Sequence, residues 1–396
     1  MIRRFFLVLV FAGTLGTLWV APQWSPSAPV AAVGTAGPIP ARLTDQQFWG
    51  LVTRLSEPGG HFRSENLVSN EHTFQYVIPS LVERVRGGVY LGVAPDQNFT
   101  YIAAIQPKIA FIVDIRRGNL LEHLMYKAVI ELSRDRAEFV SRLFSRPRPP
   151  GLGSASSVEE LFAAFAESNM SEVLYAENLE AIRTHLVETR DFPLSASDLE
   201  QLEAIYWQFF WQGPDIRYTM SAPVPSPFGG RAFGGFIRRG FWSNFPTYQE
   251  LVQQTDWAAR SWSYLASEAR FAYLKAFEER NLLVPVVGNF AGPKALRAVG
   301  RYVREHGETV SAFYVSNVEQ YLFQDGIWED FYRNVAMLPV DDSSTFIRSV
   351  SSRTGYDGPM QWSDGRATVL DPIRASVSDF LAGRIRRYYD INSRWE

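Results

Sequence analysis

Four short apolar runs constrain the fold of this chain more than any other feature. They lie at 89–93, 109–114, 282–287 and 310–315 and contain almost no charged residue. A strand with one face in water would alternate apolar and polar residues, so these uninterrupted runs are typical of parallel strands that are covered on both faces. A helical pattern separates the first run from the second and the third from the fourth. Each pair therefore predicts a strand–helix–strand unit with a right-handed connection.

The two units, at 88–115 and 282–316, predict an α/β fold with one open, mostly parallel sheet and helices on both of its faces. A later alternating segment, 345–350, is expected to add an edge strand. Helical and loop patterns at about 150–260 indicate a large insertion between the units. We therefore expect one Rossmann-like domain over 43–396.

The N-terminal segment has the pattern of an export signal. Two arginines precede an uncharged apolar run at 5–21, whose 17 residues are at the lower end of the ~17–25 that a membrane-spanning helix needs. Small residues near Ala32 suit a cleavage site, so 1–32 is predicted to be a signal peptide or, alternatively, an uncleaved anchor. Residues 33–42 are expected to form a flexible linker. Both readings place the folded part outside the cytoplasm, either periplasmic or secreted, with membrane contact only through this segment.

Composition excludes several kinds of site. The chain has no Cys, which rules out iron–sulfur clusters, zinc–thiolate sites, disulfides and a thiol nucleophile. Its 39 Lys and Arg stand against 42 Asp and Glu without a basic block, so no nucleic-acid binding is expected. The five His show no metal-ligand spacing, and no metal is expected.

The turns that follow the four strands should meet at one edge of the sheet, where ligands bind in open α/β folds. Six residues of these turns are candidates for ligand binding: Gly92, Asp96, Asn98, Asp114, Asn289 and Asn317. The first turn lacks the Gly-rich patterns that bind dinucleotides or triphosphates. An anionic pyrophosphate would also be repelled by Asp96, which favours a neutral or cationic small molecule, for example a nucleoside-like one.

The role of each candidate stays open. Asp114 lies 22 residues after Gly92, where an acid can bind ribose hydroxyls, but it could equally pair with the arginines that follow it. Asn289 and Asn317 could hold a flat polar group or satisfy their own turns.

Two further segments could reach the ligand. Asn70 or Glu71 could extend over the sheet, although an N-cap role for the helix at 74–85 is the alternative; His72 is the His expected nearest the site. The Gly/Pro-rich segment 212–246 could cover the site as a lid or pack on the sheet.

Three stretches of the chain resemble an uncharacterised family of secreted bacterial proteins with a methyltransferase-like Rossmann fold. They are GVYLGVAPDQNFTY at 88–101, FIVDIRRGN at 111–119 and VPVVGNFAGPKAL at 284–296, and the similarity extends over about 43–356.

A weaker likeness to S-adenosylmethionine-dependent methyltransferases implies positions for three candidates. It puts Gly92 at the first glycine motif, Asp114 at the ribose-binding acid and Asn289 in a motif after the fourth strand. The chain departs from that pattern because residues 94–96 are Ala, Pro and Asp where further glycines are usual.

The sequence thus predicts a protein of unknown function with a methyltransferase-like fold, acting on a small molecule with S-adenosylmethionine as cofactor. The alternative is a non-catalytic extracytoplasmic ligand-binding or interaction module on the same fold, because S-adenosylmethionine is made in the cytoplasm. A third interpretation is an enzyme that acts on another nucleotide-like or small polar ligand.

Overall fold

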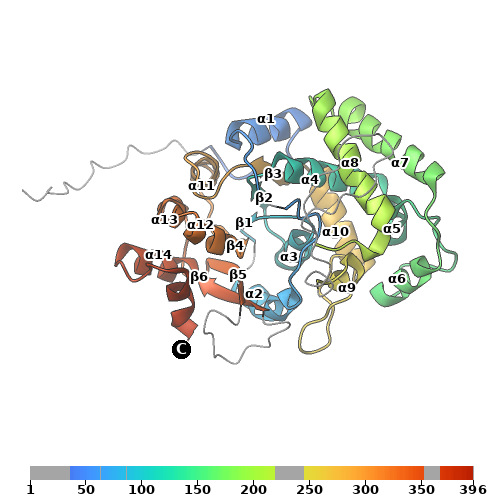
Figure 1. Ribbon diagram of the computed structural model, residues 1–396. Coiled ribbons are helices and arrows are strands. Elements are labelled where there is room, and N and C mark those ends of the chain that lie inside the picture. Colours follow the sequence, from blue (N-terminus) through green and yellow to red (C-terminus); the bar gives the residue numbers. More distant parts are fainter. Residues whose placement is uncertain (1–35, 63, 86, 219–244, 352–365, 396) are drawn as a thin grey trace, which may run out of the picture. The chain divides into compact units, whose positions relative to one another are not determined.

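The computed structural model describes residues 36–395 apart from 63, 86, 219–244 and 352–365. In this part of the chain, six strands form one sheet in the order β3-β2-β1-β4-β5-β6 (Figure 1). The strands are β1 (Val89–Gly92), β2 (Ile109–Asp114), β3 (Leu283–Val287), β4 (Val310–Ser316), β5 (Thr345–Ser351) and β6 (Arg366–Pro372). Neighbouring strands pair in parallel except for β5 and β6, which are antiparallel. The prediction of an α/β fold with a mostly parallel sheet is confirmed, and the sheet is compatible with a Rossmann-like fold.

Helices on the two faces of the sheet follow from the strand order. The chain moves from β1 to β3 in one direction and then returns past β1 to β4, so right-handed connections place the helices of the two halves on opposite faces. Figure 1 shows α3 and α4 on one side of the strands and α11, α12 and α13 on the other. The helices of the described chain outside the insertion are α1 (Asp45–Leu55), η1 (Phe74–Val77), α2 (Ile78–Arg84), α3 (Gln97–Ile105), α4 (Arg117–Leu132), α11 (Ala295–Glu305), α12 (Val318–Gln324), α13 (Trp328–Val335), α14 (Ile373–Leu381) and η5 (Tyr388–Trp395).

The insertion lies between β2 and β3 and packs against α4. Its helical elements are α5 (Arg136–Phe144), α6 (Val158–Ala166), α7 (Glu172–Thr184), the π-helical turn η2 (His185–Thr189), α8 (Ala196–Gln212), η3 (Gly213–Asp215), α9 (Tyr248–Val252) and α10 (Glu268–Glu279). The sequence pattern predicts one helix from 120 to about 143, and this is wrong. The helix breaks after Leu132, because Asp135 accepts a hydrogen bond from the backbone N–H of Glu138 and begins α5.

The C-terminal strands differ from the prediction. A strand at 345–350 is confirmed, but its expected edge position is wrong, because β5 pairs with β4 on one side and with β6 on the other. Helix α14 follows β6. Both elements come after 352–365, which is outside the described residues.

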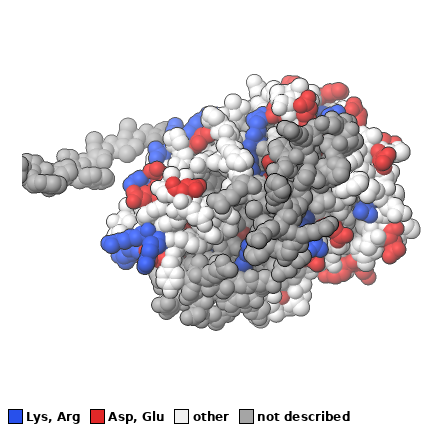
Figure 2. Space-filling model, in the orientation of Figure 1, with Lys and Arg blue, Asp and Glu red and all other residues white. Residues whose placement is uncertain are grey.

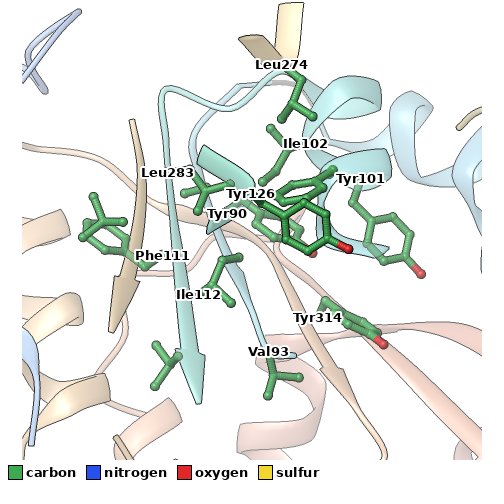
Figure 3. Packing of buried hydrophobic residues seen from close by; sticks show 14 of the residues in the cluster. Tyr90, Val93, Tyr101, Ile102, Phe111, Ile112, Tyr126, Leu274, Leu283 and Tyr314 are labelled. Atoms are coloured by element: carbon green, nitrogen blue, oxygen red, sulfur yellow. The ribbon is translucent and has the colours of Figure 1, made fainter. Parts of the chain in front are cut away.

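The core lies on both faces of the sheet. Figure 3 shows Tyr90 of β1, Tyr101 and Ile102 of α3 and Tyr126 of α4 packed beside the strands, together with Leu274 of α10. The aromatic run at 206–211 is predicted to be core, and its residues 206, 209 and 210 are buried whereas Trp211 is exposed. The expected signal or anchor segment at 1–32 lies outside the described residues, as does most of the Gly/Pro-rich segment 212–246.

Among the helices that the structure describes, none is both long and apolar enough to span a bilayer. On the face shown in Figure 2, acidic and basic side chains are interspersed with uncharged ones.

Candidate functional site

A pocket of about 150 Å³ lies at the carboxyl ends of the strands. Its walls include residues 93–95 after β1, 114–116 at the end of β2, 288–290 after β3 and 316–318 at the end of β4. The predicted meeting of the four turns is therefore confirmed. The pocket also sits where the strand order reverses, because β1 has β2 on one side and β4 on the other, and this is where open α/β sheets bind ligands.

The structure divides the six predicted binding residues into two groups. Asp114, Asn289 and Asn317 line the pocket. The other three, Gly92, Asp96 and Asn98, are not among its described lining residues. The ligand-binding roles of all six stay predictions.

Asn98 and Gly92 shape the first turn. The Asn98 side-chain NH₂ donates to the carbonyl oxygens of residues 93–95 at 2.7–3.0 Å, and its Oδ1 accepts from the Tyr90 hydroxyl at 2.8 Å. A Cβ at Gly92 would lie 2.0 Å from that Oδ1. The turn is strained as well, since Ala94 has φ +64°. The turn thus needs glycine at 92 so that the Asn98 amide can hold it closed.

Asp114 forms a buried ion pair with Arg116. Its Oδ1 accepts from the Arg116 backbone N–H at 2.9 Å and from Nε at 3.0 Å, and its Oδ2 accepts from Nη2 at 2.9 Å. The predicted alternative of pairing with a following arginine is confirmed. A carboxylate offers about four acceptor positions, so about one remains for a ligand in the pocket.

The two asparagines also have local bonds. Asn289 Oδ1 accepts from the Ala291 backbone N–H at 2.9 Å, which confirms the turn-forming alternative for this atom. The Asn317 amide lies 3.5 Å from Ser316 Oγ, whose single hydrogen is donated to Glu71 at 2.6 Å. The local bond of Asn289 uses its amide oxygen, so the Asn289 NH₂ group is left as a donor for the pocket.

Glu71 lies in the pocket wall and is 2% exposed. Its Oε1 accepts from Tyr314 OH at 2.8 Å and from Ser316 Oγ at 2.6 Å, and its Oε2 accepts from Gln97 Nε2 at 3.1 Å. Asn70 and Glu71 both line the pocket, and their contact with a ligand stays a prediction. The N-cap of η1 comes from the same segment, but from Thr73 rather than from Asn70 or Glu71.

Several lining residues come from a loop that sequence reasoning did not include. His61 and Phe62 line the pocket, whereas His72 is not among its described lining residues. The loop is fixed beside β2, because the Gly60 backbone N–H donates to the Ile115 carbonyl at 2.8 Å and a Cβ at Gly60 would meet the Ile115 side chain at 2.5 Å. Consecutive glycines at 59–60 were the available signal for this close approach.

Aromatic side chains form much of the remaining wall. The rings of Phe62 and Tyr321 meet edge to face at 4.9 Å, and Phe290, Tyr218 and Tyr314 also face the pocket. The pocket therefore combines flat apolar surfaces with a few hydrogen-bonding groups, as small-molecule sites usually do.

Behind the first turn, α4 presents a buried polar face. Asn119, Glu122, His123 and Tyr126 follow the i, i+3, i+4, i+7 spacing of one helical face, and each is at most 1% exposed. Each has a buried polar atom without a hydrogen-bond partner among the residues that the structure describes, and so does Asp96 at the start of α3. Such a concentration is unusual, because nearly all buried polar groups in proteins are paired.

Burial governs the protonation of this polar face. It raises the pKa of Asp96 to about 7 and that of Glu122 well above its usual range, and it lowers the pKa of His123 to about 4. The neutral His123 ring carries its proton on Nε2, because this atom lies 3.0 Å from the Ala94 carbonyl oxygen, which can only accept. Among the described residues, no group of three or more His, Asp or Glu is placed to hold a metal ion.

Fold and site together define an α/β protein with a mostly parallel sheet and a small-molecule-sized pocket at the reversal of its strand order. The chain belongs to the family of the domain of unknown function DUF7790, whose model matches residues 66–190 and 242–377. The matched residues carry all six strands and most of the pocket. A search of curated proteins found no match.

Proposed function

We propose that the pocket binds a nucleoside-like small molecule, that this ligand is S-adenosylmethionine, and that the chain is a small-molecule methyltransferase. The observation that carries the proposal is the position of Asp114, at the end of β2 and in the wall of a pocket at the strand-order reversal. An acid there accepts from ribose hydroxyls in nucleoside-binding sheets.

The pocket chemistry supports this ligand in two ways. About one acceptor position of Asp114 is open, which suits one ribose hydroxyl. The aromatic wall, the Asn289 NH₂ group and the Asn317 amide suit a flat base with ring acceptors. The chain would contribute to methyl transfer mainly by holding cofactor and acceptor together in the right orientation.

A non-catalytic ligand-binding module is the second candidate, and the size of the pocket favours it. A volume of about 150 Å³ is smaller than the ~300–1,000 Å³ of pockets that enclose drug-sized ligands. The pocket as it stands would hold a nucleoside or one part of a larger molecule. The predicted export signal at 1–32 supports the same candidate, because it would separate the chain from cytoplasmic S-adenosylmethionine.

Titration calorimetry on the full-length protein tests the binding step. We expect micromolar affinity for S-adenosylmethionine, weakened about tenfold by Asp114→Asn, since one lost charge-assisted hydrogen bond costs ~1.5–3 kcal/mol. The matched control is Asp342→Asn, whose exposed carboxylate lies before the amino end of β5, whereas the pocket lies at the carboxyl ends of the strands. No heat at millimolar S-adenosylmethionine, S-adenosylhomocysteine or adenosine would refute the proposal.

Transfer of a labelled methyl group to candidate acceptors then separates the two candidates, because binding without transfer supports the module. Cell fractionation tests the supply of cofactor. An unprocessed cytoplasmic product would remove the objection to methyl transfer, whereas a processed extracytoplasmic one would strengthen the second candidate.

A further inference from the structure

The charge balance of the pocket indicates what kind of ligand it accepts. Glu71 is almost fully buried, and both of its carboxyl oxygens accept hydrogen bonds, from Tyr314, Ser316 and Gln97. As a carboxylate, Glu71 accepts from all three groups at once, and all three are neutral.

No cation of the described chain forms an ion pair with this carboxylate. The buried cation of the pocket wall, Arg116, is occupied, because its Nε and Nη2 bind the two oxygens of Asp114 and its Nη1 donates to the Glu65 carbonyl oxygen. Burying a carboxylate without a counter-ion is costly, and neutral hydrogen bonds offset only part of the cost. Among the described residues, the Glu71 carboxylate is therefore a negative charge of the pocket wall without a counter-ion.

Aromatic rings complete a surface that suits a cation. Tyr314 lines the pocket and donates to Glu71, while Phe62, Tyr218 and Tyr321 stand in the same wall. The negative faces of such rings attract alkylated cations by ~0.5–2 kcal/mol each, and more when water is excluded. An anionic ligand would be repelled by the Glu71 carboxylate and by the negative faces of these rings.

We infer that Glu71 and the aromatic wall bind a positively charged organic group, a sulfonium or an alkylammonium, and that the pocket selects ligands for this charge. The inference rests on the proposed function in taking this pocket as the ligand site, and it names Glu71 as the residue that recognises the charge. Neither the sequence pattern nor the family match assigns this role.

Two pairs of probes test the charge preference on the full-length protein by calorimetry. S-adenosylmethionine and S-adenosylhomocysteine differ by one methyl group and its positive charge. Choline and 3,3-dimethyl-1-butanol have the same shape, but only choline is charged. We expect the charged member of a binding pair to bind at least tenfold more tightly than the neutral one.

Glu71→Gln keeps the shape of the side chain and removes its charge. We expect this variant to bring the affinity ratio of each pair close to one by weakening only the charged member. Unchanged affinity for the neutral member then shows that the pocket is intact. The control Asp342→Asn removes an exposed charge before the amino end of β5 and should leave both ratios unchanged.

The outcomes separate this inference from the proposed function. Equal binding of the two adenosyl ligands, with Glu71→Gln weakening neither or both alike, overturns the inference and leaves the proposed function standing. Binding of choline over its neutral analogue, without binding of any adenosyl ligand, keeps the inference and overturns the proposed function. Absence of a charge preference in both pairs refutes the inference whatever else binds.

Discussion

Asp96 offers a test of the structure that does not depend on any ligand. Its carboxyl group is buried at the start of α3, and within the described part of the chain Oδ1 has no hydrogen-bond partner. Burial raises its pKa from 3.8 to about 7. We predict that Asp96→Asn, which keeps the shape and removes the ionisable group, stabilises the protein at alkaline pH more than at acidic pH.

The sign follows from proton binding. Between pH 3.8 and about 7, the folded state keeps a proton on Asp96 that the unfolded state has lost, so the free energy of unfolding falls as pH rises through this window. A shift of about three pKa units corresponds to roughly 4 kcal/mol above pH 7 and about 2 kcal/mol at pH 5. The variant should therefore gain about 2 kcal/mol more over the wild type at pH 8 than at pH 5.

Urea unfolding of both proteins at pH 5 and pH 8 measures this difference. The wild type alone is not diagnostic, because burial also raises the pKa of Glu278 to about 8 and gives the same trend. Asp342→Asn is the exposed control and should show no such gain. The same stabilisation at both pH values, or none, would mean that Asp96 is not buried in the way described.

The remaining predictions concern packing and buried charge. Gly92→Ala should cost ~1–3 kcal/mol and lower the melting temperature in a calorimetric scan, because its Cβ would lie 2.0 Å from the Asn98 oxygen, which is fixed by hydrogen bonds; an unchanged melting temperature would contradict this. Arg348→Met should cost ~3–5 kcal/mol in urea unfolding, because it leaves the buried Glu319 without its cation. The exposed Arg374→Met should cost at most ~1 kcal/mol, and equal losses in the two arginine variants would argue against a buried pair.

The sheet could be predicted because its signal is local. In a run such as 109–114, the apolar side chains point to both faces of the sheet, and the run forms β2 with the same bounds. Strand β6 carries Arg366, Asp371 and Pro372, so it lacks such a run and takes its place only by pairing with β5. Propensity alone does not reveal a strand that depends on a partner distant in sequence.

The position of the pocket was predictable, but most of its side chains were not. Topology requires the ends of β1 to β4 to meet, and this brings Asp114 and Asn289 together. Whether a side chain points into the pocket depends on the turn conformation, and Asn98 is used to close its own turn. Phe62 and Glu71 reach the pocket from segments before the first strand, which the strand pattern does not place.

Helix α4 shows why the insertion could not be positioned from sequence. The spacing of Leu121, Leu124 and Met125 predicts one buried apolar face. The opposite face, which carries the polar residues at 119, 122, 123 and 126, is buried as well. The helix forms a middle layer between the sheet and the insertion, and a helix covered on both sides cannot be recognised from one apolar stripe.

Buried charges connect this middle layer to the insertion. Lys127 of α4 lies 2.8 Å from Glu131 and 3.6 Å from Glu278 of α10, and Glu131 also pairs with Arg190, which follows η2. Removing one partner of such a network leaves an uncompensated charge in the core, which costs several kcal/mol. The insertion therefore cannot separate from α4 without exposing or unpairing these groups. We expect the insertion and the sheet to unfold in a single transition, and two separate transitions in urea would show that this network does not couple them.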